Sequence, residues 1–212
     1  GWCDWSSDVC SSDLAAATKR VAAAVDTPVY SASGTLSDDA SAAGVYAAAE
    51  KALGGIDILV NNAGGESSGG GSGPWLESTP DDWVQNYNSN VASMVRLIKR
   101  AVPGMKARGW GRIINLSSVS VDMPMTVIPD YQAAKAGIRT LTRSLAATLA
   151  HTGITVNSIS PGLTHSTGPE RWLRGIAAAQ GWSDDWAEIR AIVERDMIKN
   201  FTGKMGEPAD IA

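Results

Sequence analysis

Short, largely apolar runs alternate with longer amphipathic segments along most of the chain. The runs at 28–33, 56–60, 112–116 and 155–159 have the length of β-strands. Such short apolar strands are typical of a sheet that is covered on both faces. The pattern therefore predicts strands that belong to a parallel sheet.

Helical periodicity fills the segments between these strands. Val45, Ala49 and Leu53 recur one turn apart, and Gly54 follows as a stop signal. Pro103 is expected to bend or end the third helix early. The expected helices cover 15–25, 38–53, 80–108, 129–151, 169–180 and 183–198. Strands that alternate with helices predict an α/β fold, with a Rossmann-like doubly wound parallel sheet.

Composition narrows the class of protein. The chain has 212 residues, of which 44% are hydrophobic and 19% charged, with a net charge of -4. This balance is typical of one globular domain and argues against a nucleic-acid-binding surface, which would cluster Lys and Arg. No apolar run approaches the roughly 18–20 residues that span a bilayer, and no signal peptide is recognisable. We therefore expect a cytoplasmic protein without nucleic-acid or membrane partners.

The first fourteen residues differ from the rest. Residues 4–14 read DWSSDVCSSDL, with three acids, no base and no helical or strand period. They resemble the translation of a common sequencing-adapter oligonucleotide, so we expect 1–14 to be an artefactual segment and 15–212 to be the domain. A natural disordered tail is the alternative. Cys3 and Cys10 have no second Cys pair or nearby His, so no metal site is expected.

The first chemical signal directly follows the run at 56–60. Asn61, Asn62, Ala63 and Gly64 stand where a parallel strand ends, and small residues there let a ligand approach the backbone. An ordinary turn is the alternative. The Gly/Ser-rich segment 65–73 is expected to be a flexible loop and not a phosphate loop, because no Lys-Ser/Thr follows its glycines.

The second signal combines Ser118, Tyr131 and Lys135. Tyr131 and Lys135 are four residues apart at the start of an expected helix, so their side chains share one face. A nearby ammonium favours the phenolate and lowers the tyrosine pKa from about 10, which lets the phenol exchange a proton. Ser118 ends a strand and can hydrogen-bond a substrate oxygen. A third signal is Pro161-Gly162 after 155–159, where a turn is again the alternative.

Together these motifs resemble the classical short-chain dehydrogenase/reductase family. The resemblance runs from residue 15 to 212 and includes NNAG, a helix Asn, the Ser–YxxxK spacing and VNxxxPG. It implies that Tyr131 is the general acid/base, that Lys135 lowers its pKa and binds the nicotinamide ribose, and that Ser118 polarises the substrate oxygen. Asn90 resembles the helix residue that holds a water in the proton relay.

The resemblance also implies an NAD or NADP site. The residues matched to the adenosine half are Asn61, Ala63 and Gly64, and those matched to the nicotinamide side are Pro161, Gly162, Thr164 and Ser166. By this resemblance the family's first strand, its TGxxxGIG turn, the next strand and the last strand have no counterpart here, and without the end of the second strand the preference between NAD and NADP is not readable. In the family sheet the first two strands lie between 28–33 and 56–60, and their absence opens a gap of about 14 Å. We therefore expect the 212-residue chain to be unstable and to bind the cofactor poorly.

The leading hypothesis is an oxidoreductase that interconverts a ketone or aldehyde and an alcohol, such as a 3-oxoacyl-thioester reductase. A non-catalytic fragment or cofactor-binding scaffold is the alternative. By resemblance the intact protein is a homodimer or homotetramer. Trp186, Ile189 and Val193 form a helical stripe that favours packing, and His165 is interpreted as a loop residue.

Overall fold

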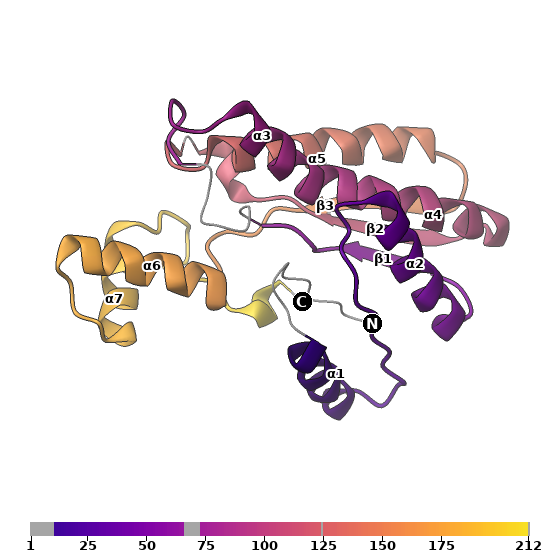
Figure 1. The fold of residues 1–212 in the computed structure, drawn as a ribbon, viewed down its shortest axis with the longest axis horizontal. Coiled ribbons are helices and arrows are strands. Elements are labelled where there is room, and N and C mark those ends of the chain that lie inside the picture. The colour runs from indigo at the N-terminus through magenta and orange to yellow at the C-terminus, as the bar shows by residue number, and fades with distance from the viewer. Residues whose placement is uncertain (1–10, 66–72, 124, 212) are drawn as a thin grey trace. The chain divides into compact units, whose positions relative to one another are not determined.

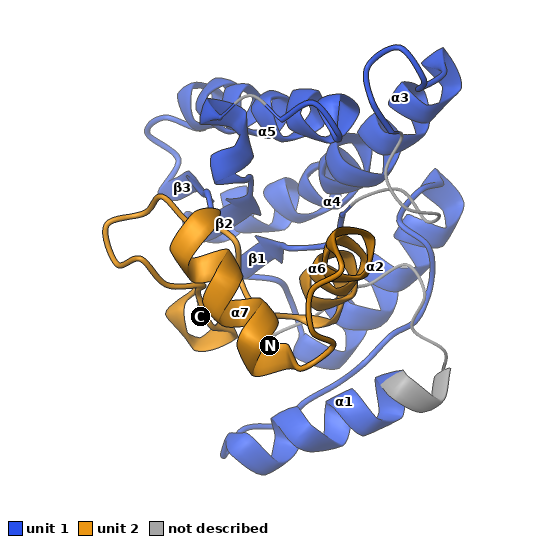
Figure 2. Cartoon of the chain, turned by 90° about the vertical axis from the view of Figure 1, so that its left-hand side faces the viewer, with its two compact units in different colours: residues 1–160 blue, residues 161–212 orange. Residues whose placement is uncertain are grey.

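The chain forms two compact units in the computed structural model, which describes residues 11–65, 73–123 and 125–211. The first unit ends at Ser160 and the second begins at Pro161. Figure 2 shows the two units in different colours. Each unit has a hydrophobic core of its own, so each is described by itself.

The first unit contains a parallel sheet of three strands in the order β1-β2-β3. These are β1 (Ile58–Asn61), β2 (Gly111–Leu116) and β3 (Ile154–Ile159). Asn61 lies opposite Asn115 in the register of β1 and β2. The predicted parallel α/β architecture of Rossmann type is confirmed, and the strands begin or end within two residues of the expected bounds.

Helices form the crossover connections that join the parallel strands. Two of them, α4 (Ser93–Arg108) and α5 (Pro129–Thr148), pack on one face of the sheet. Figure 1 shows this layer above the strands, with α3 (Pro80–Tyr87) beside α5. Before β1 come α1 (Ser11–Ala24) and α2 (Asp39–Leu53), and α2 packs on α4.

Local signals explain where several helices begin and end. The Thr79 side chain accepts a hydrogen bond from the Asp82 backbone, and the Asp82 carboxylate accepts one from the Thr79 backbone, which makes a capping box for α3. Gly54 ends α2 with a left-handed φ of 74°, which glycine adopts without strain. The core between α4, α5 and the sheet is apolar and consists of Ile56, Val91, Met94, Ile98, Ala101, Met105, Ile113, Ala134, Ile138, Leu149, Ile154 and Val156.

Two expectations about this unit are wrong. Residues 28–33 do not form a strand. An isolated strand gains no ladder hydrogen bonds, and no described segment pairs with this one. Pro103 neither ends nor interrupts α4, because the buried side chains of Ala101 and Met105 hold the helix on both sides of it. The interruption comes earlier, at a π-helical turn over Asn88–Ala92.

The second unit contains α6 (Thr167–Gln180), α7 (Trp186–Asp196) and a short 3-10 turn at Pro208–Asp210. Thr164 pairs with Gly206, which ties the two ends of the unit together. Its core consists of Leu173, Ala177, Ile189, Val193 and Met205, with Trp172, Trp182 and Trp186 packed against them. The predicted packing role of the stripe formed by Trp186, Ile189 and Val193 is therefore confirmed.

Candidate active site

The candidate site lies where the parallel strands of the first unit end. Asn61 closes β1 and is buried; its Nδ2 donates to Asn115 Oδ1 over 2.8 Å. Asn115 Nδ2 in turn donates to Thr142 Oγ1 on α5 over 3.0 Å. This chain of amides ties two strand ends to the helix that carries Tyr131. Asn61 Oδ1 is buried without a hydrogen-bond partner among the described residues, which is unusual unless a ligand or water completes the site.

Lys135 is the buried cation of the site. Its side chain reaches the end of β2, where Nζ donates to Leu116 O over 3.0 Å. Its backbone carbonyl accepts a hydrogen bond from Ser117 Oγ over 2.8 Å, so α5 is bonded twice to this strand end. Burial lowers the pKa of the Lys135 ammonium from 10.5 to about 8, because the charged form loses its hydration.

Tyr131 lies one turn before Lys135 on the same face of α5, as the spacing predicts. The Lys135 ammonium is 5.4 Å from the centre of the Tyr131 ring. At this distance a cation stabilises a phenolate more than a neutral phenol. Tyr131 is only half-buried, so the ring remains within reach of a substrate.

Ser118 lies two residues after the end of β2, in extended backbone conformation, and not at the end of the strand as expected. Its Oγ accepts a hydrogen bond from Ser120 N over 3.2 Å and begins a 3-10 turn. Gln132, next to Tyr131, holds the segment that follows. Its amide nitrogen donates to Ser120 O and Met123 O, and its oxygen accepts from Met125 N. The segment between Ser118 and Tyr131 is thereby bonded to the start of α5.

Asn90 lies in the π-helical turn and is fully buried. Its Oδ1 accepts from Gly65 N over 3.1 Å and its Nδ2 donates to Gly65 O over 2.9 Å. The turn therefore clamps the backbone that follows NNAG. Gly64 allows this contact, because a Cβ there would lie 2.6 Å from Asn90 Oδ1. π turns are frequent at functional sites, since they re-aim a side chain out of helical register.

Two further buried residues, Asn86 and Asp130, join this cluster and were not predicted. Asn86 Nδ2 donates to Asp130 Oδ2 over 2.8 Å, and Asn86 Oδ1 accepts from Asn90 Nδ2 over 2.9 Å. The four-residue spacing of Asn86 and Asn90 was the available signal, because it places two amides on one helical face. Nothing comparable in the sequence marks Asp130 as their partner.

The predicted site residues divide between the two units. The first unit contains Asn61, Ala63, Gly64, Asn90, Ser118, Tyr131 and Lys135, and the second contains Pro161, Gly162, Thr164 and Ser166. Thr164 Oγ1 donates to Gly162 O over 3.1 Å, and Ser166 immediately precedes α6. A Cβ added at Gly162 would contact nothing within 4 Å, so the backbone there is open to a ligand.

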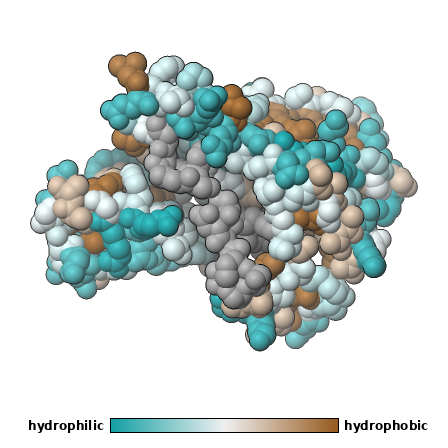
Figure 3. Space-filling model, in the orientation of Figure 1, coloured by the Kyte–Doolittle hydropathy of each residue, from teal (hydrophilic) through white to brown (hydrophobic). Residues whose placement is uncertain are grey.

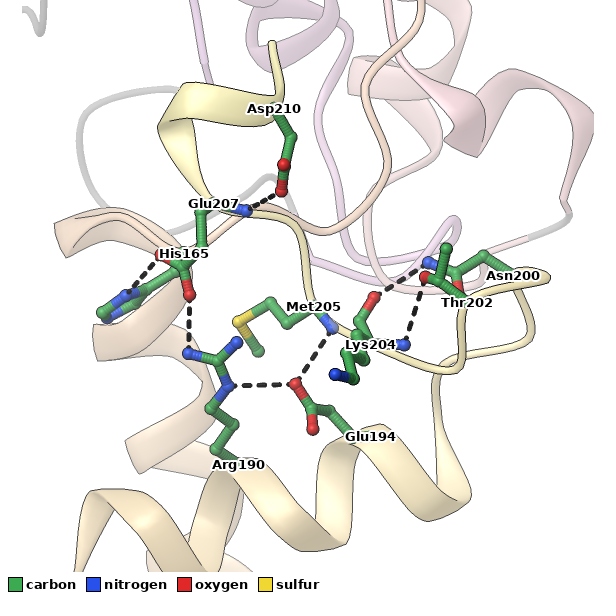
Figure 4. Close-up of polar contacts among 9 residues, drawn as sticks. All are labelled: His165, Arg190, Glu194, Asn200, Thr202, Lys204, Met205, Glu207 and Asp210. Atoms are coloured by element: carbon green, nitrogen blue, oxygen red, sulfur yellow. Dashed lines mark hydrogen bonds and ion pairs between the residues drawn. The ribbon is translucent and has the colours of Figure 1, made fainter.

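His165, between Thr164 and Ser166, makes more contacts than a simple loop residue. Its ring nitrogens lie 3.2 Å from Glu170 Oε2 and 3.5 Å from Glu207 Oε2. The ring also stacks on Trp186, with 5.1 Å between the ring centres. Figure 4 shows how Glu207 continues this cluster to Arg190 on α7. The histidine thus joins the beginning and the end of the second unit.

Among the described residues, no group of three or more His, Cys, Asp or Glu is placed to hold a metal ion. Cys3 and Cys10 lie outside the described residues. No described helix combines the length and the apolar character that crossing a membrane requires.

A family model described as short chain dehydrogenase matches residues 5–173. The chain belongs to the short-chain dehydrogenase family. Nodulation protein G of Azospirillum brasilense is 40% identical over 133 residues, which are 63% of this chain and 52% of that protein. Acetoacetyl-CoA reductase of Cupriavidus necator is 37% identical over 110 residues, which are 52% of this chain and 43% of the reductase.

The same family relationship is visible in three dimensions. The crystal structure of L-sorbose reductase from Gluconobacter frateurii, complexed with NADPH and L-sorbose, superposes with a TM-score of 0.84 at 25% identity. The match covers 95% of this chain and 74% of the reductase. The chain thus spans about half the length of the two curated relatives above and three quarters of this solved structure.

Proposed function

We propose that this chain carries the catalytic part of an NAD(P)-dependent oxidoreductase that interconverts a ketone or aldehyde and an alcohol. The observation that carries the proposal is the Lys135 ammonium, which is buried, bonded to Leu116 O and 5.4 Å from the Tyr131 ring. A buried cation beside a half-exposed phenol is an arrangement for moving a proton near neutral pH.

In the reduction direction, the Tyr131 hydroxyl donates its proton to the developing alkoxide of the substrate. The Lys135 ammonium stabilises the phenolate that remains, since the two opposite charges interact in a poorly hydrated site. Ser118 Oγ donates a hydrogen bond to the same substrate oxygen and so polarises the carbonyl. In the oxidation direction the phenolate accepts the proton instead.

A nicotinamide cofactor would supply or accept the hydride when bound. The residues of the first unit fit its ribose and adenosine contacts: Lys135 Nζ has three N–H donors, and Asn61 Oδ1 is a buried acceptor with no described partner. Ala63 and Gly64 follow Asn61 and offer backbone groups. In the second unit, Pro161, Gly162, Thr164 and Ser166 would meet the nicotinamide side. The residues do not discriminate between NAD and NADP.

The substrate class follows from the chemistry of proton and hydride transfer. We propose a small carbonyl compound, with a 3-oxoacyl thioester or a sugar-derived ketone as the first candidates. The names of two relatives, acetoacetyl-CoA reductase and L-sorbose reductase, support these two choices.

A homodimer or homotetramer is the proposed assembly. A mostly apolar groove lies between α4 and α5. It is lined by Val95, Ile98, Leu141 and Leu145, together with Lys99, Ser144 and Thr148. Figure 3 shows brown hydrophobic surface in this region. A groove lined by partly buried apolar side chains between two helices supports association with a second copy.

The exchange Tyr131→Phe tests the proposed reaction. We expect it to lower kcat by about 10²-fold or more with acetoacetyl thioester or L-sorbose and NADH or NADPH, because the acid/base is lost. Tyr46→Phe is the matched control, since Tyr46 donates its hydroxyl hydrogen bond to Glu50 on the surface of α2. Equal rates for Tyr131→Phe and the parent would remove the assignment. A folded parent without any reductase activity would favour the non-catalytic scaffold.

A further inference from the structure

The carboxylate of Asp130 is buried next to the candidate acid/base, and no recognised motif accounts for it. Asp130 is 2% exposed, lies in the first turn of α5 and immediately precedes Tyr131. Oδ2 accepts a hydrogen bond from Asn86 Nδ2 over 2.8 Å, whereas Oδ1 has no partner among the described residues. A buried carboxylate that is only partly satisfied is costly, and an apolar side chain would pack there at lower cost.

The hydrogen bonds that begin at Asp130 run in one direction. Asn86 donates to Asp130, Asn90 Nδ2 donates to Asn86 Oδ1 over 2.9 Å, and Gly65 N donates to Asn90 Oδ1 over 3.1 Å. All four residues are in the first unit, and α3 lies beside α5. The series therefore connects the first turn of α5 to the loop that follows NNAG.

The chemistry of the groups fixes this direction. An ionised carboxylate has only acceptors, whereas an Asn side chain has an acceptor and a donor end. Asp130 therefore requires the Nδ2 of Asn86 to face it, which leaves Oδ1 of Asn86 to face Asn90. That oxygen requires the Nδ2 of Asn90, so the Oδ1 of Asn90 is available for Gly65 N. One carboxylate thus sets the orientation of the Asn86 amide and supports that of Asn90, whose Nδ2 also donates to Gly65 O over 2.9 Å and to Asn86 O over 3.1 Å.

The position of Asp130 in α5 also favours an acidic residue. This residue lies in the first turn of a helix whose N-cap, Ile128, provides no side-chain hydrogen bond. Unpaired backbone N–H groups and the helix dipole favour a negative charge there. The same turn therefore carries the phenol of Tyr131 and the charge that sets the amide series.

We propose that Asp130 and Asn86 are positioning residues that orient Asn90 and, through it, the Gly65 backbone beside the candidate active site. The orientation itself depends only on the contacts above. Its consequence for catalysis rests on the function proposed for Tyr131 and Asn90. The two can be tested apart, because the orientation has a readout that needs neither cofactor nor substrate.

Hydrogen exchange of the Gly65 amide, followed by NMR on the whole chain, is that readout. Asp130→Leu keeps a side chain of similar size and removes the acceptor, which frees the Asn86 amide to reorient and to withdraw its oxygen from Asn90. We expect the Gly65 amide to exchange about tenfold faster, the effect of losing a hydrogen bond that contributes about 1.4 kcal/mol. Asp130→Asn should restore slow exchange, because its side-chain oxygen can still accept from Asn86.

Thr142→Val is the matched control. It also removes a buried acceptor of an asparagine amide in the same unit, that of Asn115, but it is outside the series. A role of Asp130 in stability alone predicts that all slow amides of the unit accelerate together in both variants. Gly65 exchange that is no faster in Asp130→Leu than in Thr142→Val would overturn the proposal. If Asp130→Leu does not fold, Asn86→Ala removes the next acceptor and should give the same selective change at Gly65.

Kinetics of the active protein give the second readout. We expect Asp130→Leu to lower kcat about tenfold, with KM within about twofold and recovery in Asp130→Asn, because misplacement of catalytic groups affects the transition state most. An unchanged kcat in Asp130→Leu would overturn the catalytic consequence. If Gly65 exchange changes as expected while Tyr131→Phe remains fully active, the positioning inference stands and the proposed function fails.

Discussion

The two units differ in where their polar side chains lie, because every buried polar side chain among the described residues belongs to the first unit. In the first unit the series of Asn61, Asn115 and Thr142 is neutral, and none of its members is more than 4% exposed. This unit has surface ion pairs as well, such as that of Arg108 and Asp57. In the second unit the contacts are charged and near the surface, as for Arg190 and Glu207, whose side chains are 29% and 45% exposed. Hydrogen bonds between buried amides are directional and are strengthened by the absence of water. Surface ion pairs depend on charge, and salt weakens them.

The hydrophobic cores of the two units also differ in size. Among the described residues, twelve form the buried core of the first unit and five form that of the second. The smaller core leaves the second unit more dependent on contacts such as those of His165, Arg190 and Glu194, which Figure 4 shows reaching the chain segment around Met205. The first unit is therefore expected to respond strongly to the loss of one buried group, and the second to salt and pH.

The largest effect is expected when the buried amide series is cut. Asn115→Ala removes the acceptor of Asn61 Nδ2 and the donor to Thr142 and leaves a cavity, so it should cost about 2–4 kcal/mol. The matched exchange in the second unit is Asn200→Ala. Asn200 also makes two side-chain hydrogen bonds, to Lys204 O and from Thr202 Oγ1, but it is exposed, so its loss should cost less than about 1 kcal/mol.

Chemical unfolding of both variants measures this difference. Similar losses of unfolding free energy would show that burial does not distinguish the units. A loss at Asn115 that disappears in high salt would also contradict the comparison, because a neutral buried hydrogen bond is not screened.

The second-largest effect on stability is expected at Lys135, which is the one strongly buried cation among the described residues of the candidate site. Its pKa is about 8 in the folded chain and 10.5 as the ordinary value, so between these pH values the unfolded state binds more protons. The free energy of unfolding of the parent therefore rises as the pH rises from about 8 to 10.5, because the cost of burying the charged ammonium is progressively removed. Lys135→Met should be more stable than the parent at pH 7, by about 2–3 kcal/mol, and the advantage should shrink towards pH 10.

Unfolding free energies of the parent and Lys135→Met across pH 6–10 test this difference. A constant difference between the two proteins over the whole range would show that Lys135 titrates with its ordinary pKa. Because the variant lacks the proposed ribose contact, it should also lose activity while it gains stability, as expected when a functional group is kept at a cost.

Local signals predicted most of the fold, and the exceptions depend on partners distant in the chain. Thr79 and Gly54 mark helix ends with their own side chain or backbone, so the start of α3 and the end of α2 could be predicted. The segment 28–33 has a strand-like sequence but no described partner, and strand formation requires one.

The candidate site divides in the same way. The spacing of Tyr131 and Lys135 predicted that they share a face of α5, because a helix determines that locally. The partner of Asp130 is Asn86, 44 positions earlier in the chain, and neither residue belongs to a family motif. His165 lies in a loop, as interpreted, but the sequence did not indicate its contact with Glu207, which the pairing of Thr164 with Gly206 brings near.

The smallest effect is expected at Glu170 in the second unit. Hydrogen bonds from Arg174 and then from His165 hold the pKa of its carboxyl below the ordinary 4.5. A carboxylate with a lowered folded pKa stabilises the fold above pH 4.5 and loses that contribution as pH falls through the folded value.

Glu170 is at the surface, so 1 M salt should return its pKa towards the ordinary value, whereas salt should leave the pKa of buried Lys135 almost unchanged. NMR titration of the Glu170 carboxyl and the Lys135 ammonium at low and high salt compares them directly. An equal effect of salt on the two pKa values would contradict the expected difference between buried groups of the first unit and surface ion pairs of the second.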